Sequence, residues 1–353
     1  MGCLDSYNLW KSDEFFNLII RNKLQNLTDE KEIKDRFERD LEIISGGAIG
    51  IMDAGTNRIN QYTVGRIAAG LGNYLIGKYG EDARNRGVVV AFDTRNNSKY
   101  FARVTADVLS SLGIKVYLHS LVCPIPQLSY TIRLWKSVSG VMITALDSPK
   151  EYNGIIIYDE EGNNVSADVS NDIAACVKSI EDYRKINFAE NSDLIHKGDV
   201  ADDYISFVRK QSRLDDNELK RKLKIVYTPL HGTGNVIVTA SFMLEGFTNL
   251  THVNEQVKQD GDFSTLDGLK PDVKGLLEMA IAQGVREDAD IVIATSPACD
   301  RCFVATRSGE DFVMLGDERI DALLSEYAAD DIYKGDAIVR CILICELAAK
   351  VTK

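Results

Sequence analysis

The chain has 353 residues, of which 45% are hydrophobic and 27% are charged, and its formal net charge is −12. This length predicts about two domains, and an acidic chain without a basic cluster excludes nucleic acid as an expected partner. No apolar run approaches the roughly 20 residues that cross a bilayer, so we expect no membrane association.

The first 42 residues predict an N-terminal helical arm. Residues 8–27 carry an apolar stripe, and residues 29–43 alternate acidic and basic side chains along a helix. The opening MGCLDS also fits the Gly-x-x-x-Ser pattern of N-myristoylation. Because that pattern is short, we favour an ordinary N-terminus.

Residues 43–190 predict a first α/β domain. After a glycine-rich turn comes a helix whose apolar positions keep 3.6-residue spacing, namely Val64, Ile67, Leu71, Tyr74 and Leu75. Short apolar strands then alternate with amphipathic helices: the strands are GVVVAF (87–92), GIKVYL (113–118) and GVMITA (140–145), and the helices are 99–112 and 127–135. This alternation is typical of a mainly parallel sheet that helices cover.

A polar stretch at residues 181–199 predicts the boundary to a second α/β domain, which we assign to residues 195–330. Its predicted strands are 224–229, 251–255 and 290–295; one helix opens at HGTGN (231–235), and two others cover 272–282 and 317–329.

The last apolar run, AIVRCILIC (337–345), predicts one more strand. It has no visible sheet of its own to join, and barely two helical turns follow it. We therefore expect residues 335–353 to be the stub of a third domain whose remainder is absent.

Five segments carry a family resemblance: IMDAGTNRIN (51–60), VAFDTRNNS (90–98), PKEYNG (149–154), YTPLHGTGN (227–235) and DIVIATSPACDR (290–301). In this order and spacing they resemble the α-D-phosphohexomutase superfamily, in its phosphoglucomutase and phosphomannomutase branch. The resemblance implies two consecutive α/β domains with mainly parallel mixed sheets, plus the first strand of a third domain. Members of the family interconvert sugar 1-phosphates and 6-phosphates through a phosphorylated serine and a Mg²⁺ ion, chemistry that depends on in-line positioning and charge neutralisation.

The family's catalytic loop reads T-A-S-H-N-P, whereas residues 144–149 read T-A-L-D-S-P. Leu146 therefore stands in the slot of the phosphorylated serine, and it has no lone pair with which to attack phosphorus. Asp147 stands in the slot of the histidine and Ser148 in that of the asparagine. Ile156 occupies a position where many members carry lysine.

Two other nucleophiles lie in this loop. Ser148 is two residues from the slot, which is roughly 6 to 7 Å along an extended chain, whereas reacting atoms must approach to about 3 to 3.5 Å. Asp147 could form an aspartyl phosphate, but such sites also need a bound cation. We expect neither side chain to replace the missing serine.

The family's metal loop reads D-P-D-x-D-R, and residues 296–301 read S-P-A-C-D-R. Three carboxylates suit a hard ion such as Mg²⁺. Ser296 and Ala298 occupy two of these slots, and Asp300 alone is kept. The resemblance therefore implies that the Mg²⁺ site is lost, and we expect no cofactor.

Four residues remain candidates for weak binding of a sugar phosphate or another anion: Arg95, Lys150, His231 and Arg301. His231 lies in a turn whose backbone N–H groups could meet a phosphate at a helix start. The same turn is equally explained by the backbone freedom of Gly232 and Gly234. Arg95 and Lys150 are either an anion pocket or surface cations, and the sequence leaves both open.

The seven cysteines are scattered, and their odd number without a signal peptide predicts reduced thiols in the cytoplasm. Cys299 with Cys302, and Cys341 near Cys345, have the close spacing of redox or zinc motifs. The resemblance offers a simpler account of the first pair, because a cysteine before the Asp-Arg pair is ordinary in this branch. The second pair lies in an apolar strand, where thiols pack well.

The replaced groups are the nucleophile, its neighbouring histidine, two metal ligands, a lysine and an arginine whose slot holds Ile49. We therefore expect a phosphoglucomutase- or phosphomannomutase-like protein that is catalytically inactive and acts as a binding or interaction protein. Its C-terminal strand would pair with a second copy or another chain through its unpaired edge. The alternative is a phosphohexomutase of carbohydrate metabolism whose residual activity on hexose phosphates is complemented by another subunit.

Overall fold

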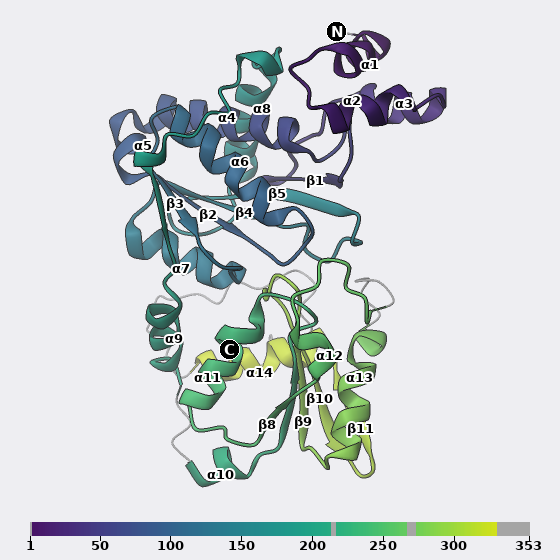
Figure 1. Cartoon of the computed structure of the whole chain (residues 1–353). Helices are drawn as coiled ribbons and strands as arrows, with labels where there is room; N and C mark the ends of the chain where they lie inside the picture. Colours follow the sequence, from purple (N-terminus) through teal and green to yellow (C-terminus); the bar gives the residue numbers. More distant parts are fainter. Residues whose placement is uncertain (1, 213–216, 267–272, 330–353) are drawn as a thin grey trace.

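The computed structural model describes residues 2–212, 217–266 and 273–329 (Figure 1). They form two successive α/β units, each built on its own mixed sheet, which confirms the predicted fold class. The predicted strand at 337–345, the stub at 335–353 and the cysteines Cys341 and Cys345 lie outside the described residues.

Six strands form the first sheet in the order β1-β5-β4-β2-β3-β6. They are β1 (Gly47–Ile51), β2 (Val88–Phe92), β3 (Val116–His119), β4 (Ser139–Ile143), β5 (Tyr152–Tyr158) and β6 (Ile195–Gly198). Strands β4, β2, β3 and β6 run parallel, whereas β5 pairs antiparallel with both β1 and β4. The sheet is therefore parallel in its centre and antiparallel at one edge.

Helices cover both faces of this sheet. They are α4 (Gln61–Tyr79), α5 (Glu81–Arg86), α6 (Ser98–Ser111), α7 (Ile125–Trp135) and α8 (Ala167–Lys178). Because successive side chains of a strand point to opposite faces, Val88 and Val90 of β2 pack in the core shared with α4 and α6, while Val89 packs in a second cluster with Leu128 of α7. Burial on both faces explains why β2 and β4 are continuous apolar runs.

The first 42 residues, predicted to be an arm, are helical but packed. They form α1 (Cys3–Ser12), α2 (Leu18–Gln25) and α3 (Glu30–Phe37). Trp10 stacks on Phe16 with ring centroids 4.4 Å apart, and its ring meets Tyr62 of α4 and Tyr183 edge to face. These helices therefore form a layer on the first unit, at its end far from the second unit (Figure 1).

The boundary between the units differs from the predicted one. Strand β6 pairs in parallel with β3, so residues 195–198, which the sequence analysis assigned to the second domain, belong to the first sheet. An edge strand with solvated side chains carries few apolar residues, and both His196 and Lys197 are exposed. The short 3₁₀ turns η1 (Tyr183–Lys185) and η2 (Ser192–Leu194) precede this strand.

The second sheet has five strands in the order β11-β10-β9-β7-β8. They are β7 (Ile225–Thr228), β8 (Leu250–His252), β9 (Ile291–Thr295), β10 (Cys302–Ser308) and β11 (Asp311–Leu315). Strands β8, β7 and β9 run parallel, and β10 and β11 extend the sheet antiparallel from β9. The accompanying helices are α9 (Ala201–Arg209), α10 (Asn217–Lys222), α11 (Gly234–Leu244), α12 (Asn254–Val257), α13 (Val273–Arg286) and α14 (Asp317–Ala329).

Within the described residues, no helix combines the length and the apolar character that crossing a bilayer requires.

Candidate functional site

Four loops at the strand ends meet where the two units face each other. They are residues 93–98 after β2, 144–151 between β4 and β5, 229–233 after β7, and 296–301 between β9 and β10. In α/β sheets this is the edge at which ligands bind. The four loops contain all the candidate residues from the sequence except Ile49 and Ile156, which lie in strands β1 and β5.

Arg95 holds the loop between β4 and β5. Its side chain is fully buried. Its two Nη atoms donate to three carbonyl oxygens of that loop and to the one that begins β5, those of Leu146, Ser148, Pro149 and Tyr152, at 2.6, 2.7, 3.0 and 3.3 Å. A guanidinium has five N–H groups, and Nε, which carries the fifth, lies 3.5 Å from Asp93 Oδ2. Arg95 is therefore neither a surface cation nor free to bind an anion, but a clamp on the loop.

Asp93 and Asn153 connect the same loop to the segment after β2. The buried Asp93 carboxylate accepts from the backbone N–H of Arg95 at 2.9 Å and from the Ser98 hydroxyl at 2.6 Å. Asn153 donates to the Asn96 carbonyl and to Ser98 Oγ, at 2.9 Å each. Burial raises the pKa of Asp93, and the nearby Arg95 charge opposes that rise. The family motif around residues 93–98 thus serves here to fix loop geometry.

Leu146 lies near the start of the clamped loop in the left-handed backbone conformation, with φ of 53°, which is uncommon for a leucine. Its side chain packs against the apolar cluster that contains Met142 and Leu128. The family's nucleophile slot is therefore occupied by a hydrocarbon side chain in contact with the core. Ile156, in the lysine slot, is also buried, and Ile49, in the arginine slot, is partly exposed in β1.

Asp147 and Arg301 join the two units. Arg301 Nη1 donates to Asp147 Oδ2 at 2.8 Å, and its Nη2 donates to Asp317 Oδ2 at 3.2 Å. The guanidinium also lies over the Phe303 ring, 5.3 Å from its centroid. The sequence did not indicate that these residues pair, because 154 positions separate Asp147 from Arg301. The candidate anion-binding cation Arg301 is thus balanced by two carboxylates.

The loop in the family's metal position is bonded internally. The Ser296 hydroxyl donates to Asp300 Oδ1 at 2.8 Å and accepts the backbone N–H groups of Asp300 and Arg301 at 3.2 Å each. Ala298 is buried, and its carbonyl accepts from the Ile125 N–H of the first unit at 3.0 Å. One carboxylate does not supply the six oxygen ligands of Mg²⁺. Over the described part of the chain, no group of three His, Cys, Asp or Glu side chains is arranged to hold a metal ion.

His231 is buried, and both of its ring nitrogens have partners. Nδ1 donates to the Lys258 carbonyl at 2.9 Å, and Nε2 lies 2.8 Å from the Thr265 hydroxyl, within hydrogen-bond distance. The N–H groups of residues 231, 232 and 233 donate to carbonyls of Gln256, Pro229 and Pro297. Of the two interpretations that the sequence left open, this geometry favours a strand-to-helix turn. Lys150 differs from the other candidates, because it is exposed and has no ion pair with any described residue.

The five described cysteines are free thiols, including Cys299 and Cys302 of the C-x-x-C spacing. Burial raises the pKa of Cys299 to about 12. A protonated thiol is a poor nucleophile and metal ligand, so Cys299 is a packing residue.

Two family models match the chain. The phosphoglucomutase/phosphomannomutase alpha/beta/alpha domain I model matches residues 45–184, and the corresponding domain II model matches residues 202–309. Both matches fall on the two units described above.

Curated relatives give the same result. A phosphoglucomutase of Staphylococcus haemolyticus is 32% identical over 323 residues, which is 90% of this chain and 58% of that protein. A phosphoglucomutase of Staphylococcus epidermidis is 31% identical over 316 residues, 88% of this chain and 56% of that protein. The chain therefore spans a little more than half the length of these relatives.

Solved structures share the fold. A phosphoglucomutase/phosphomannomutase family protein of Burkholderia thailandensis aligns with a TM-score of 0.66 at 20% identity, over 81% of this chain and 58% of that one. The Paramecium phosphoglucomutase parafusin, in its open form, aligns with a TM-score of 0.63 at 17% identity, over 88% and 60%.

Proposed function

The chain belongs to the phosphoglucomutase/phosphomannomutase family, and from this premise we propose that it is a non-catalytic member that binds or interacts without transferring phosphoryl groups. The observation that carries the proposal is Leu146, which stands in the nucleophile slot and packs against the apolar cluster under α7. A hydrocarbon side chain cannot form a phosphoenzyme.

The neighbouring side chains do not supply a substitute. Ser148 has its carbonyl bonded to Arg95 at 2.7 Å, so moving Ser148 into the slot would break the clamp. Asp147 is paired with Arg301. To form an aspartyl phosphate, its carboxylate would need a bound metal cation nearby, but this carboxylate is already neutralised by the arginine. Both positions support the inactive interpretation.

The metal loop supports the same interpretation. Phosphoryl transfer needs cations that neutralise the developing charge, and the three described residues in the family's ligand positions are a hydroxyl, a methyl group and one carboxylate. That carboxylate already accepts a hydrogen bond from Ser296. We expect no Mg²⁺ binding at this loop.

A binding role is supported by apolar surface on the second unit. Val236, Met243 and Leu244 of α11 are 65%, 50% and 53% exposed, and Phe207 of α9 is 40% exposed. Beside them lies a cavity of about 330 Å³ between the units, lined by Pro124, Tyr204, Ile237 and Phe242 among others. Exposed apolar side chains on neighbouring helices are a feature of interaction sites, whereas the C-terminal strand first expected to pair lies outside the described residues.

A second candidate function rests on the relatives, which are named phosphoglucomutases. In this alternative, the chain retains activity on hexose phosphates when another subunit supplies the missing groups.

Isothermal titration with glucose 1-phosphate and glucose 6-phosphate, with and without Mg²⁺, separates the two candidates. Our proposal predicts no turnover and no Mg²⁺-dependent binding of either hexose phosphate. It also predicts that Asp300→Asn leaves the measured binding unchanged, with and without Mg²⁺. Mg²⁺-dependent binding that Asp300→Asn abolishes would instead support the enzyme and contradict the proposal.

A further inference from the structure

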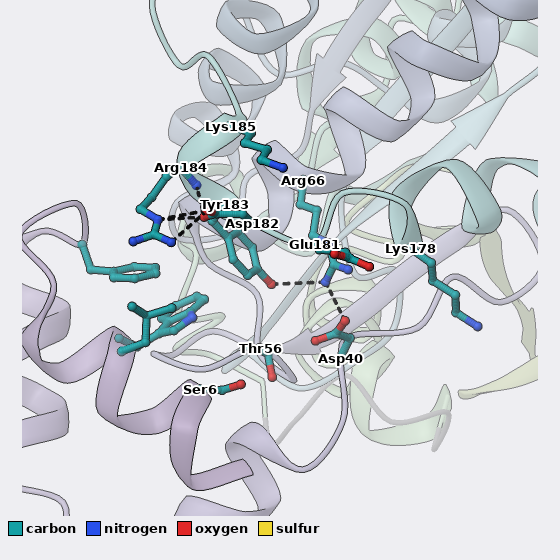
Figure 2. Close-up of a pocket in the computed structure, with 13 residues that line it drawn as sticks. Ser6, Asp40, Thr56, Arg66, Lys178, Glu181, Asp182, Tyr183, Arg184 and Lys185 are labelled. Atoms are coloured by element: carbon teal, nitrogen blue, oxygen red, sulfur yellow. Dashed lines mark hydrogen bonds and ion pairs between the residues drawn. The ribbon is translucent and has the colours of Figure 1, made fainter. Parts of the chain in front are cut away.

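A second hollow lies on the first unit, away from the cleft between the units. Its volume is about 570 Å³, and residues of α1, the loop after α3, α4 and segment 178–185 line it (Figure 2). Three buried side chains in its wall, Trp10, Arg66 and Tyr183, define what we call the Trp10 hollow. Its volume lies within the range of small-molecule sites.

Arg66 provides a buried cation in this hollow. Its Nη1 donates to Asp40 Oδ2 at 2.6 Å and lies 3.5 Å from the Tyr183 hydroxyl, as the dashed lines in Figure 2 mark. Its Nε donates to the Val177 carbonyl at 3.2 Å, and its guanidinium lies 5.4 Å from the centroid of the Tyr183 ring. These contacts fix the guanidinium plane, but its Nη2 has no acceptor among the described residues.

Trp10 and Tyr183 add two more donors. Trp10 is 1% exposed and lines the hollow, and within the described residues (2–212, 217–266 and 273–329) its indole N–H makes no hydrogen bond. The Tyr183 oxygen accepts from Arg66, which leaves its own hydrogen available. Burial raises the pKa of Tyr183 to about 12, so its hydroxyl remains a donor at neutral pH.

The charges around the hollow favour an anion. Asp40 is paired with Arg66, and Asp182 is paired with Arg184. Lys178 and Lys185 also line the hollow, and neither has an ion pair with a described residue. Among the carboxylates that line it, Glu181 alone has no ion pair with a described residue. The two lysines outweigh Glu181 among the unpaired side chains, while Arg184 balances two carboxylates, Asp13 and Asp182.

We propose that the Trp10 hollow binds a small organic anion, whose carboxylate or phosphate oxygens accept from the indole N–H of Trp10, the Tyr183 hydroxyl and Arg66 Nη2. Such charge-assisted hydrogen bonds are about twice as strong as neutral ones. This site is separate from the cleft between the units, and it does not depend on the function proposed there.

The two tryptophans of the chain make a direct test possible, because Trp135→Phe leaves Trp10 as the only tryptophan in the sequence. The full chain carrying this substitution is titrated with inorganic phosphate, glucose 6-phosphate and succinate at constant ionic strength, with glucose as the neutral control. We expect a saturable change in Trp10 emission with the anions and none with glucose. A stronger response to the phosphates or to succinate identifies which oxyanion the site prefers. No saturable change with any anion, or an equal response to glucose, would overturn the proposal.

A variant separates binding from structure. Tyr183→Phe keeps the ring that packs on Trp10 but removes the donor, and we expect affinity about 10-fold weaker. Tyr130→Phe, in an aromatic cluster between α7 and α9, is the matched control and should leave affinity unchanged. Melting temperature measured with each ligand provides a readout independent of fluorescence. If Tyr183→Phe binds the anions as tightly as the protein with Tyr183 does, the Tyr183 hydroxyl is not a donor to the ligand.

Discussion

At the scale of single residues, Arg95 illustrates why motif identity alone does not assign a role. The sequence left Arg95 open as an anion ligand or a surface cation, and the structure makes it neither. Its role depends on four carbonyl oxygens, and backbone carbonyls belong to every residue type and leave no mark in the sequence. The same holds for His231, whose partners lie 27 and 34 residues away along the chain.

Arg95→Met tests this clamp. The substitution leaves the Asp93 carboxylate buried without its cation and frees four loop carbonyls, so we expect a loss of about 3 to 5 kcal/mol in the free energy of unfolding, measured by urea denaturation. Lys150→Met, an exposed cation in the same loop, should change it by about 0.5 kcal/mol or less. Equal effects of the two substitutions would show that Arg95 is not a clamp.

His119 predicts a pH dependence. It is 2% exposed, and burial lowers its pKa from 6.5 to about 4. His119 of the unfolded chain therefore binds a proton near pH 6.5, whereas in the folded chain it does so only near pH 4. The free energy of unfolding is therefore not reduced by His119 above pH 6.5, and it falls as the pH drops from 6.5 to about 4. The gap of about 2.5 units corresponds to roughly 3 kcal/mol. Urea denaturation at a series of pH values should show a shallower decline in His119→Gln, while the exposed His196→Gln should keep the original slope.

At the scale of elements, strands and helices could be predicted from the sequence where all positions of a strand, or one face of a helix, are buried. Strands β2 and β4 are buried at every position, and their sequences are mostly apolar. Helix α4 keeps its apolar spacing from Val64 to Leu75. Elements with one solvated side were harder to recognise. Strand β6 was assigned to the wrong unit, and the hairpin of β10 and β11 was not predicted. Only Phe303 and Ala305 of β10 are buried, and the positions of β11 are exposed or half-buried, so neither strand is buried along its length.

The N-terminal helices give a prediction at this scale. Trp10 is almost fully buried between α1 and α4, so Trp10→Ala should lower the free energy of unfolding by about 3 to 5 kcal/mol, as followed by circular dichroism during urea denaturation. Leu4→Ala, on the same helix but at a side chain 64% exposed, should cost about 0.5 kcal/mol or less. A small effect of Trp10→Ala would indicate that these helices are a free arm after all.

At the scale of the whole molecule, the two units are joined through the loops that carry chemistry in the family. Arg301 bonds Asp147, Asn96 Nδ2 donates to Asp262 at 2.9 Å, and the Arg95 guanidinium lies 5.2 Å from the Phe263 ring centroid. The family resemblance predicted which loops meet, because fold and loop order follow from the motifs. It did not predict the ion pair between these loops, because Asp147, which pairs with the retained Arg301, stands where the family carries histidine.

Retention of phosphate on the protein is the most direct test of the central claim, that this chain cannot form a phosphoenzyme. The purified protein is incubated with ³²P-labelled glucose 1,6-bisphosphate and Mg²⁺, denatured, and assayed for covalent label, with peptide mapping of residues 144–149. Our account predicts no label, because Leu146 offers no nucleophile and the loop at 296–301 offers one carboxylate to a cation. Label on Ser148 or Asp147 would contradict it.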